Sequence, residues 1–255
     1  EEMSSDQLAL PEIHLEEFSD ELQNGAAPHL VELCTQALSM GGQDPGLAAA
    51  SLHCLSVWTS SELLPWPVLT PAMTIAMNAT AAPLTAACAP LTEASVAQLS
   101  AGCSLLTAAA SIHPDLEMAD ALIPAALTLR EGFTAVAATA AAGQCDSFVE
   151  SAAGALSSLF SDIGSSYREH VGRHPELLES LLHAAGHVCP EVSIAALGFW
   201  AVAGSTVLSM HAAATQPLLS ALISACEYPR DMGDRDGDYC EQKEEVRQNA
   251  RRVVA

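Results

Sequence analysis

Positive charge and aromatic side chains are both scarce in this sequence. Lys and Arg make up only 9 of the 255 residues, against 31 Asp and Glu, and no cation precedes Arg130. A surface this short of cations repels phosphate backbones, so we expect no direct nucleic-acid binding. The same imbalance favours encounter with a basic protein, and it also serves plain solubility. Charge alone does not decide between these two interpretations.

Patterns typical of strands and of disulfides are missing as well. Aromatic residues account for 4% of the chain, and Val, Ile, Thr, Tyr and Phe never gather into alternating runs between turn signals. The eight Cys stand singly with no CxxC pair, which is typical of reduced, buried thiols. Ala and Leu, which supply most of the apolar residues, are strong helix formers. The predicted fold class is all-α.

The sequence shows no signal peptide and no long uninterrupted apolar run. Glu1 and Glu2 stand where a secretory signal carries positive charge. The most apolar stretch, 118–143, is interrupted by Arg130 and Glu131, whereas a membrane span needs roughly 20 apolar residues. We therefore expect no membrane segment and no membrane partner.

Catalytic signatures are also lacking. No GxSxG, P-loop or GxGxxG motif occurs, so we predict no enzyme activity, no cofactor and no metal. His183 and His187 lie one helical turn apart with Cys189 close behind, a zinc-compatible spacing, but no fourth ligand or orienting carboxylate accompanies them. We expect ordinary packed or surface histidines. A small metal-dependent enzyme remains an alternative that metal occupancy would decide.

Apolar residues recur with the period of a helix between short Gly- and Pro-containing breaks. Within 191–208, for example, Val192, Ala196, Phe199 and Ala203 fall on one face. Successive helices pair into units of roughly 40 residues, the spacing of HEAT and armadillo repeats. We predict a superhelix of antiparallel helix pairs, with a bundle as the alternative. The predicted pairs are 46–60 with 67–80, 92–111 with 116–141, 144–170 with 175–187, and 190–208 with 212–227.

Neither end of the sequence carries a polar capping repeat, so we expect 1–255 to be one continuous array within a longer protein. Large aromatic side chains late in two Ala- and Leu-rich stretches are predicted to anchor the core. They are Trp58, Phe199 and Trp200.

The densest run of acids lies at 228–245, which we predict to be a solvated loop between helices. Aligning Gly237 with the conserved glycine of a calcium loop puts Met232 and Lys243 at two ligand positions, so calcium is not expected. A charged loop of this kind is a candidate contact for a basic partner. The candidate contact residues are Asp231, Asp234, Asp236, Asp238 and Glu241.

Three segments resemble one protein family. The segment from Cys189 to Trp200, CPEVSIAALGFW, resembles the "hP.EV...F.FW" helix of the transportin-SR/importin-13 group of β-karyopherins. Upstream, 48–58 resembles the group's "A..CL..W" helix. Downstream, 226–229 (CEYP) precedes the acidic run and a stretch that matches "E.R......V" in 245–254. Order and spacing agree over nearly the whole chain.

This resemblance implies the central part of a HEAT-repeat nuclear import receptor. Such a receptor carries basic, arginine/serine-rich protein cargo, meets nucleoporins, and is unloaded by the GTP-bound form of the GTPase Ran. It shuttles between nucleus and cytoplasm. The alternative function is an unrelated HEAT-repeat scaffold that organises a protein complex.

Overall fold

The computed structural model describes residues 19–40, 44–85, 90–112, 116–141, 147–226 and 237–254, with no side-chain description for 237–240. Over these ranges the chain forms eleven α-helices and three short helical turns, and it forms no strand. The predicted all-α class is therefore confirmed. The elements are η2 (Leu22–Ala26), α2 (Ala27–Met40), α3 (Pro45–Ser60), α4 (Trp66–Thr85), α5 (Glu93–Ile112), α6 (Leu116–Leu127), α7 (Arg130–Ala141), α8 (Ser147–Ser166), η3 (Val171–Arg173), α9 (Pro175–Ala185), α10 (Pro190–Met210), η4 (Ala212–Ala214), α11 (Thr215–Cys226) and α12 (Gly237–Val254).

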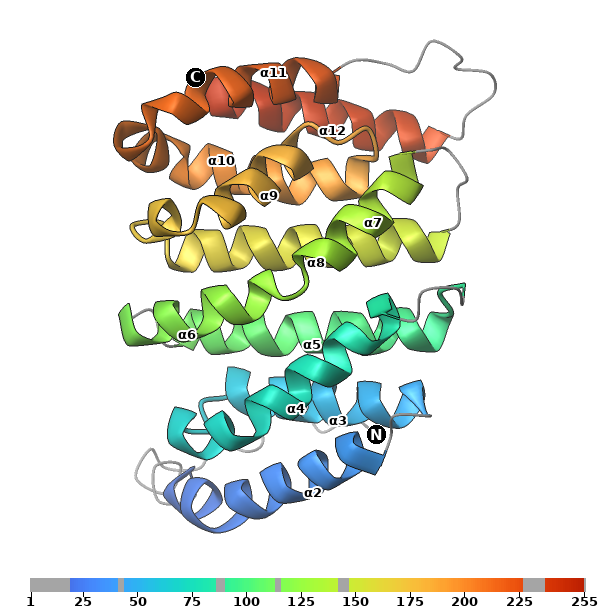
Figure 1. Cartoon of the computed structure of the whole chain (residues 1–255), viewed down its shortest axis with the longest axis vertical. Helices are drawn as coiled ribbons and strands as arrows, with labels where there is room; N and C mark the ends of the chain where they lie inside the picture. Colours follow the sequence, from blue (N-terminus) through green and yellow to red (C-terminus); the bar gives the residue numbers. More distant parts are fainter. Residues whose placement is uncertain are drawn as a thin grey trace, which may run out of the picture.

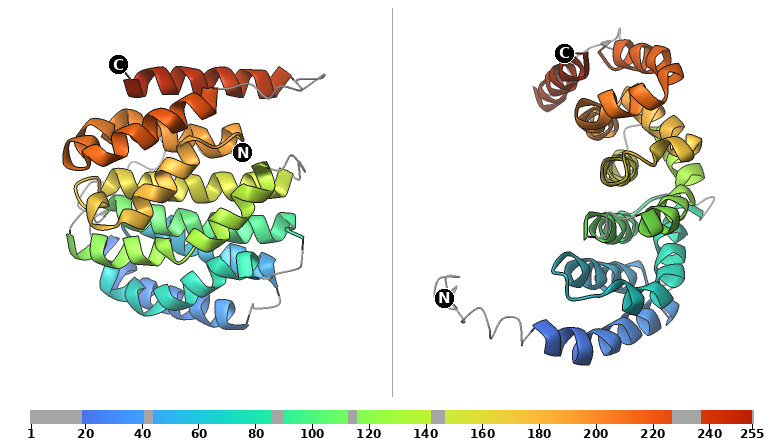
Figure 2. Two further views of the ribbon diagram at one scale, coloured as in Figure 1. Left: turned by 45° about the horizontal axis from the view of Figure 1, so that its top comes forward. Right: turned by 90° about the vertical axis from the view of Figure 1, so that its left-hand side faces the viewer.

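The helices stack in chain order in two rows (Figure 1). We call α3, α5, α8, α10 and α12 the inner row, in which each helix contacts the next. The remaining α-helices, α2, α4, α6, α7, α9 and α11, form the outer row. Seen along the helices, the two rows follow an arc, with the inner row on its concave side (Figure 2, right). Each helix therefore meets mainly the members of its own layer and of the neighbouring layers.

The helices pair differently from the prediction, since α4, α7, α9 and α11 each contact the inner-row helix that follows them more extensively than the one before. The predicted helices themselves appear with small shifts at their ends. The exception is 116–141, predicted as one helix, which is two helices bent by 47°. At the break, the Leu129 amide donates to the Ala126 carbonyl at 3.0 Å, a tighter turn than an α-helix makes. The Leu129 side chain is buried there. The apolar period runs through this break without interruption, which is why the sequence pattern did not reveal it.

Aromatic side chains join the two rows in the C-terminal half. The Phe133 ring of α7 meets the Phe160 ring of α8 edge-on at 5.4 Å. Trp200 of α10 is buried, and its indole Nε1 donates to the Leu181 carbonyl of α9 at 3.3 Å. Phe199 is buried beside it, whereas Trp58 on α3 is half-buried and packs against the core edge.

Two inner-row helices, α5 and α10, are long and apolar enough to cross a membrane, and the bent pair α6–α7 together passes the same measure. The expectation that no segment of the chain is apolar enough was therefore wrong. It relied on uninterrupted runs, while Ala- and Leu-rich helices stay apolar on average despite scattered Ser, Gly and Gln. Half of the apolar window of each single helix is buried against other helices. Helix packing thus accounts for much of that apolar surface.

The loop predicted at 228–245 is helical in its second half. α12 begins at Gly237, so 237–245 is helical, and only 227–236 lies outside the described residues. Acidic side chains in a first helical turn lie close to the unpaired amides and the positive end of the helix dipole, which favours helix formation there.

The contact between α4 and α5 depends on a glycine. A Cβ added at Gly102 would lie 2.7 Å from the Cβ of Thr80, whose buried hydroxyl is held by the Ala76 carbonyl at 2.8 Å. We expect Gly102→Ala to lower the free energy of unfolding by about 1–3 kcal/mol through overpacking. A Cβ at Gly198 meets nothing within 4 Å. Gly198→Ala, the matched control, should raise the free energy of unfolding by about 0.5–1 kcal/mol.

Urea unfolding followed by circular dichroism measures both effects. Equal shifts for the two variants would contradict the close approach of α4 and α5.

Candidate functional site

The charges on four of the five inner-row helices are all negative, and they come from three of them, α5, α8 and α10. α3, α5, α8 and α10 contain no Lys or Arg. Their acids are exposed or half-buried, so a partner on this row meets negative charge alone until it reaches α12. These acids are Glu93, Glu150, Asp162 and Glu191.

A groove of about 420 Å³ lies across α3, α5 and α8. Ligand pockets occupy roughly 300–1,000 Å³, so this volume suits a small ligand group. Hydroxyl side chains dominate its lining, with one carboxylate, one thiol and four apolar residues. The lining consists of Ser56, Ser60, Ser100, Cys103, Ser104, Thr107, Ala108, Ser111, Ile112, Ala155, Ser158, Leu159 and Asp162. All of them belong to inner-row helices.

Helical periodicity turns the hydroxyls of α5 toward the groove. Ser100, Ser104 and Thr107, followed by Ser111, are spaced by four, three and four residues, so they share one face. The opposite face of α5 meets the outer row, where the Gln98 side chain donates to the Ala79 carbonyl of α4 at 2.6 Å. The groove therefore faces away from the outer row.

The same logic places the carboxylate on α8. Phe160 points to the outer row, where its ring meets Phe133. Asp162 follows two residues later and so lies on nearly the opposite side of the helix. Its Oδ2 accepts the Thr107 hydroxyl at 3.2 Å, a contact that ties α8 to α5 across the groove.

The groove lining is rich in hydrogen-bond acceptors. The hydroxyls of Ser60, Ser104 and Ser111 each donate to the carbonyl four residues earlier, at 2.9 Å. The Thr107 hydroxyl donates to Asp162. A hydroxyl has one proton and two lone pairs, so these four oxygens retain lone pairs after their protons are used. The surface that they form suits a ligand that brings donors.

The groove contains two titratable groups, and burial raises the pKa of both. Burial by the groove walls raises the pKa of the Asp162 carboxyl, while the hydrogen bond from Thr107 opposes that rise. Burial, assisted by the negative charge of Asp162, raises the pKa of the Cys103 thiol to about 12. A nucleophilic cysteine requires a lowered pKa, so Cys103 is an inert wall of the groove.

Two further acids, Glu150 on α8 and Glu191 on α10, interact across neighbouring helices of the inner row. Burial, and then the like charge of Glu150 on α8, raises the pKa of the Glu191 carboxyl on α10. Two carboxylates that repel each other across neighbouring helices gain from a shared cation.

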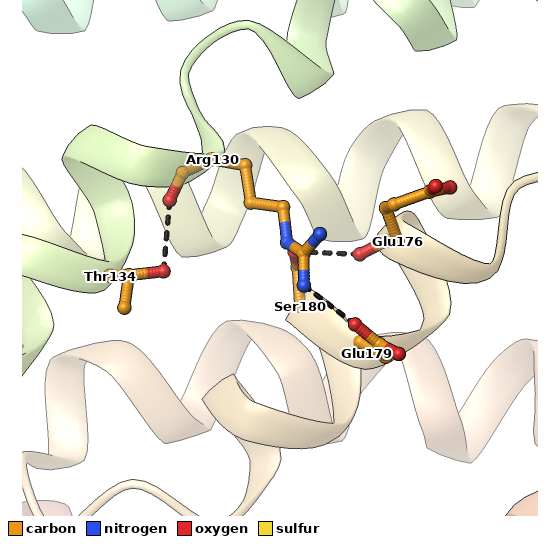
Figure 3. A network of polar contacts seen from close by, with 5 residues as sticks. All are labelled: Arg130, Thr134, Glu176, Glu179 and Ser180. Carbon is orange, nitrogen blue, oxygen red and sulfur yellow. Dashed lines mark hydrogen bonds and ion pairs between the residues drawn. The ribbon is translucent and has the colours of Figure 1, made fainter.

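Three of the described cations are engaged away from the groove. Arg130, on the outer row, donates to the Glu179 carboxylate of α9 at 2.6 Å in an exposed contact between α7 and α9 (Figure 3). On α12, the buried Lys243 ammonium donates to the Ala225 carbonyl at 3.2 Å. The Arg247 guanidinium donates to the Cys226 carbonyl at 3.4 Å. Both satisfy carbonyls at the C-terminus of α11, where positive charge is favourable.

The histidine pair considered for zinc has a structural role. The Cys189 amide donates to His187 Nδ1 at 3.1 Å, so this nitrogen carries no proton. Nε2 is therefore the protonated nitrogen, and it donates to the Ala137 carbonyl at 2.9 Å. His183 stacks edge-on between His187 and Phe133. Among the described residues, no three His, Cys, Asp or Glu side chains group as metal ligands.

The acids predicted to contact a partner fall mostly outside the described part of the chain. Asp231, Asp234 and Asp236 lie in 227–236, and Asp238 is in the first turn of α12 without a described side chain. Glu241 is exposed on α12. The sequence analysis missed the hydroxyl groove altogether. The sequence signal that could have revealed the groove is the spacing of four hydroxyl residues along a single helix face, Ser100, Ser104, Thr107 and Ser111.

Searches of family models and of curated proteins give no match for this chain.

The neutral His187 makes stability depend on pH. Burial, the largest cause, lowers the pKa of this imidazole from 6.5, so the unfolded chain takes up a proton there more readily than the folded protein. The stability that His187 provides is full above pH 6.5 and is lost as pH falls through its lowered pKa. We expect His187→Gln to lower the free energy of unfolding by about 1–3 kcal/mol at neutral pH.

The measurement is urea unfolding across this pH range. The difference between wild type and His187→Gln should shrink as pH falls, whereas His183→Gln, which leaves the bridge from Ala137 to Cys189 in place, should keep the wild-type slope. A constant difference between wild type and His187→Gln would refute the neutral bridge.

Proposed function

We propose that this chain is a protein-binding α-α superhelix of the HEAT/armadillo type that holds a basic partner segment on its inner row. The stacking of helix pairs in chain order, each meeting only its neighbours, supports a repeat array over a closed bundle. In such arrays the concave surface serves for binding. The chain acts by binding and carries out no reaction.

The observation that carries the proposal is the absence of Lys and Arg from α3, α5, α8 and α10, together with their four acids. A concave surface with charge of one sign speeds the encounter with an oppositely charged partner and disfavours like-charged ones. The groove around Asp162 adds a lining of acceptors that a basic segment can satisfy. A basic, arginine/serine-rich protein segment fits both features.

The proposed biological role is that of a nuclear import receptor segment. Two of the segments that carry the resemblance, 48–58 and 189–200, fall on α3 and on α10 with its N-cap, which are both inner-row helices. On this proposal the receptor shuttles between cytoplasm and nucleus, meets nucleoporins, and releases its cargo to the GTP-bound form of Ran. Cofactors, metals, membranes and nucleic acids have no part in this role.

The proposal predicts that the protein binds an arginine/serine-rich domain, with an affinity that falls as salt rises because exposed charges are screened. Isothermal titration at increasing salt concentration measures this binding, and the same domain with every Arg replaced by Gln is the control. Equal affinity for the two domains would contradict the proposed partner.

Release by Ran distinguishes a receptor from a scaffold. Excess GTP-bound Ran should free the arginine/serine-rich domain from the protein that contains this chain, while GDP-bound Ran should not. A domain that stays bound under GTP-bound Ran would sink the import role and favour a scaffold that organises a protein complex.

A further inference from the structure

We propose that the groove around Asp162 is a subsite for one arginine side chain of the bound segment. This inference rests on the proposed function, because it requires the inner row to bind a basic partner. It goes further in naming the side chain, the groove and the residues that discriminate an arginine from a lysine.

The acceptors of the groove match a guanidinium group. Asp162 offers two carboxylate oxygens, and the hydroxyl oxygens of Ser60, Ser104 and Ser111 keep lone pairs because their protons go to backbone carbonyls. A guanidinium brings five N–H donors in one plane and accepts nothing. It can therefore pair with the carboxylate and still give protons to hydroxyls on α3 and α5.

The apolar walls match the stem of the same side chain. Ala108 and Ile112 come from α5, and Ala155 and Leu159 come from α8. Long cationic side chains bury their methylene groups along such walls and keep the charged end at polar atoms. The groove thus offers a place for both parts of an arginine side chain.

Desolvation favours arginine over lysine in this place. The walls withdraw only part of the water around the Asp162 carboxylate, which remains exposed. A guanidinium is more weakly hydrated than an ammonium, so it loses less on entering the groove. Its planar donors also meet a carboxylate in two parallel hydrogen bonds, which a lysine cannot make.

Two variants test the subsite. Asp162→Asn keeps the shape of the side chain and an acceptor for Thr107 but removes the charge. Ser158→Arg places a guanidinium one helical turn from Asp162, where it competes with the ligand. Glu117→Gln on the outer-row helix α6, an exposed acid that is not part of the groove lining, is the matched control.

The probes are three synthetic peptides of one length, with alternating Arg and Ser, alternating Lys and Ser, and alternating citrulline and Ser. Fluorescence anisotropy at fixed salt measures their affinities, and circular dichroism verifies that each variant is folded. We expect the wild type to prefer the Arg peptide over the Lys peptide, and hardly to bind the citrulline peptide. Asp162→Asn and Ser158→Arg should each weaken binding of the Arg peptide about tenfold, the loss of a single charge-assisted pair.

The outcomes separate the two proposals. Wild-type binding of the Arg peptide that Asp162→Asn leaves unchanged, or weakens no more than Glu117→Gln does, would overturn the subsite and leave the proposed function standing. Equal affinity for the Arg and Lys peptides would overturn the assignment to arginine. A wild type that binds none of the peptides would overturn both.

Discussion

The packing of α5 between α3 and α8 is the contact on which the groove depends. Small side chains such as Ala109 and Ala110 on α5 and Ala152 on α8 are buried, which lets the helix axes approach closely. That approach brings hydroxyls from three helices to one surface and brings Thr107 within reach of Asp162. Contacts of Gly102 and Phe160 with the outer row fix the rotation of α5 and α8 about their own axes. The polar faces of both helices therefore point to the concave side.

The chemistry of the groove follows from how serine behaves inside a helix. A serine on a helix commonly gives its proton to the carbonyl four residues earlier, which satisfies the hydroxyl without any tertiary partner. Several such serines on one face therefore form a surface that accepts hydrogen bonds and has few protons to give. Combined with carboxylates and with no Lys or Arg on α3, α5, α8 and α10, this surface offers a cation both negative charge and hydrogen-bond acceptors.

The helices could be predicted because apolar period and Gly or Pro breaks are local signals. Their pairing could not, because it depends on which neighbouring helix each outer-row helix packs against. The bend at Leu129 could not, since the period continues through it, and the membrane-like hydropathy of α5 and α10 was hidden by scattered polar residues. The site was harder to predict. Ser100 and Ser104 are unremarkable until the fold shows which face of α5 meets α4, and His187 becomes a bridge only when Ala137, fifty residues earlier, is brought beside it.

Carboxylate footprinting with mass spectrometry tests most directly the claim that a basic partner binds on the inner row. The protein is labelled with a carbodiimide and an amine, with and without a saturating arginine/serine-rich domain. The account predicts that labelling falls at Glu93, Asp162 and Glu191 and is unchanged at the outer-row acids Glu117 and Asp120. Protection of the outer-row acids with unchanged labelling of the inner row would contradict it.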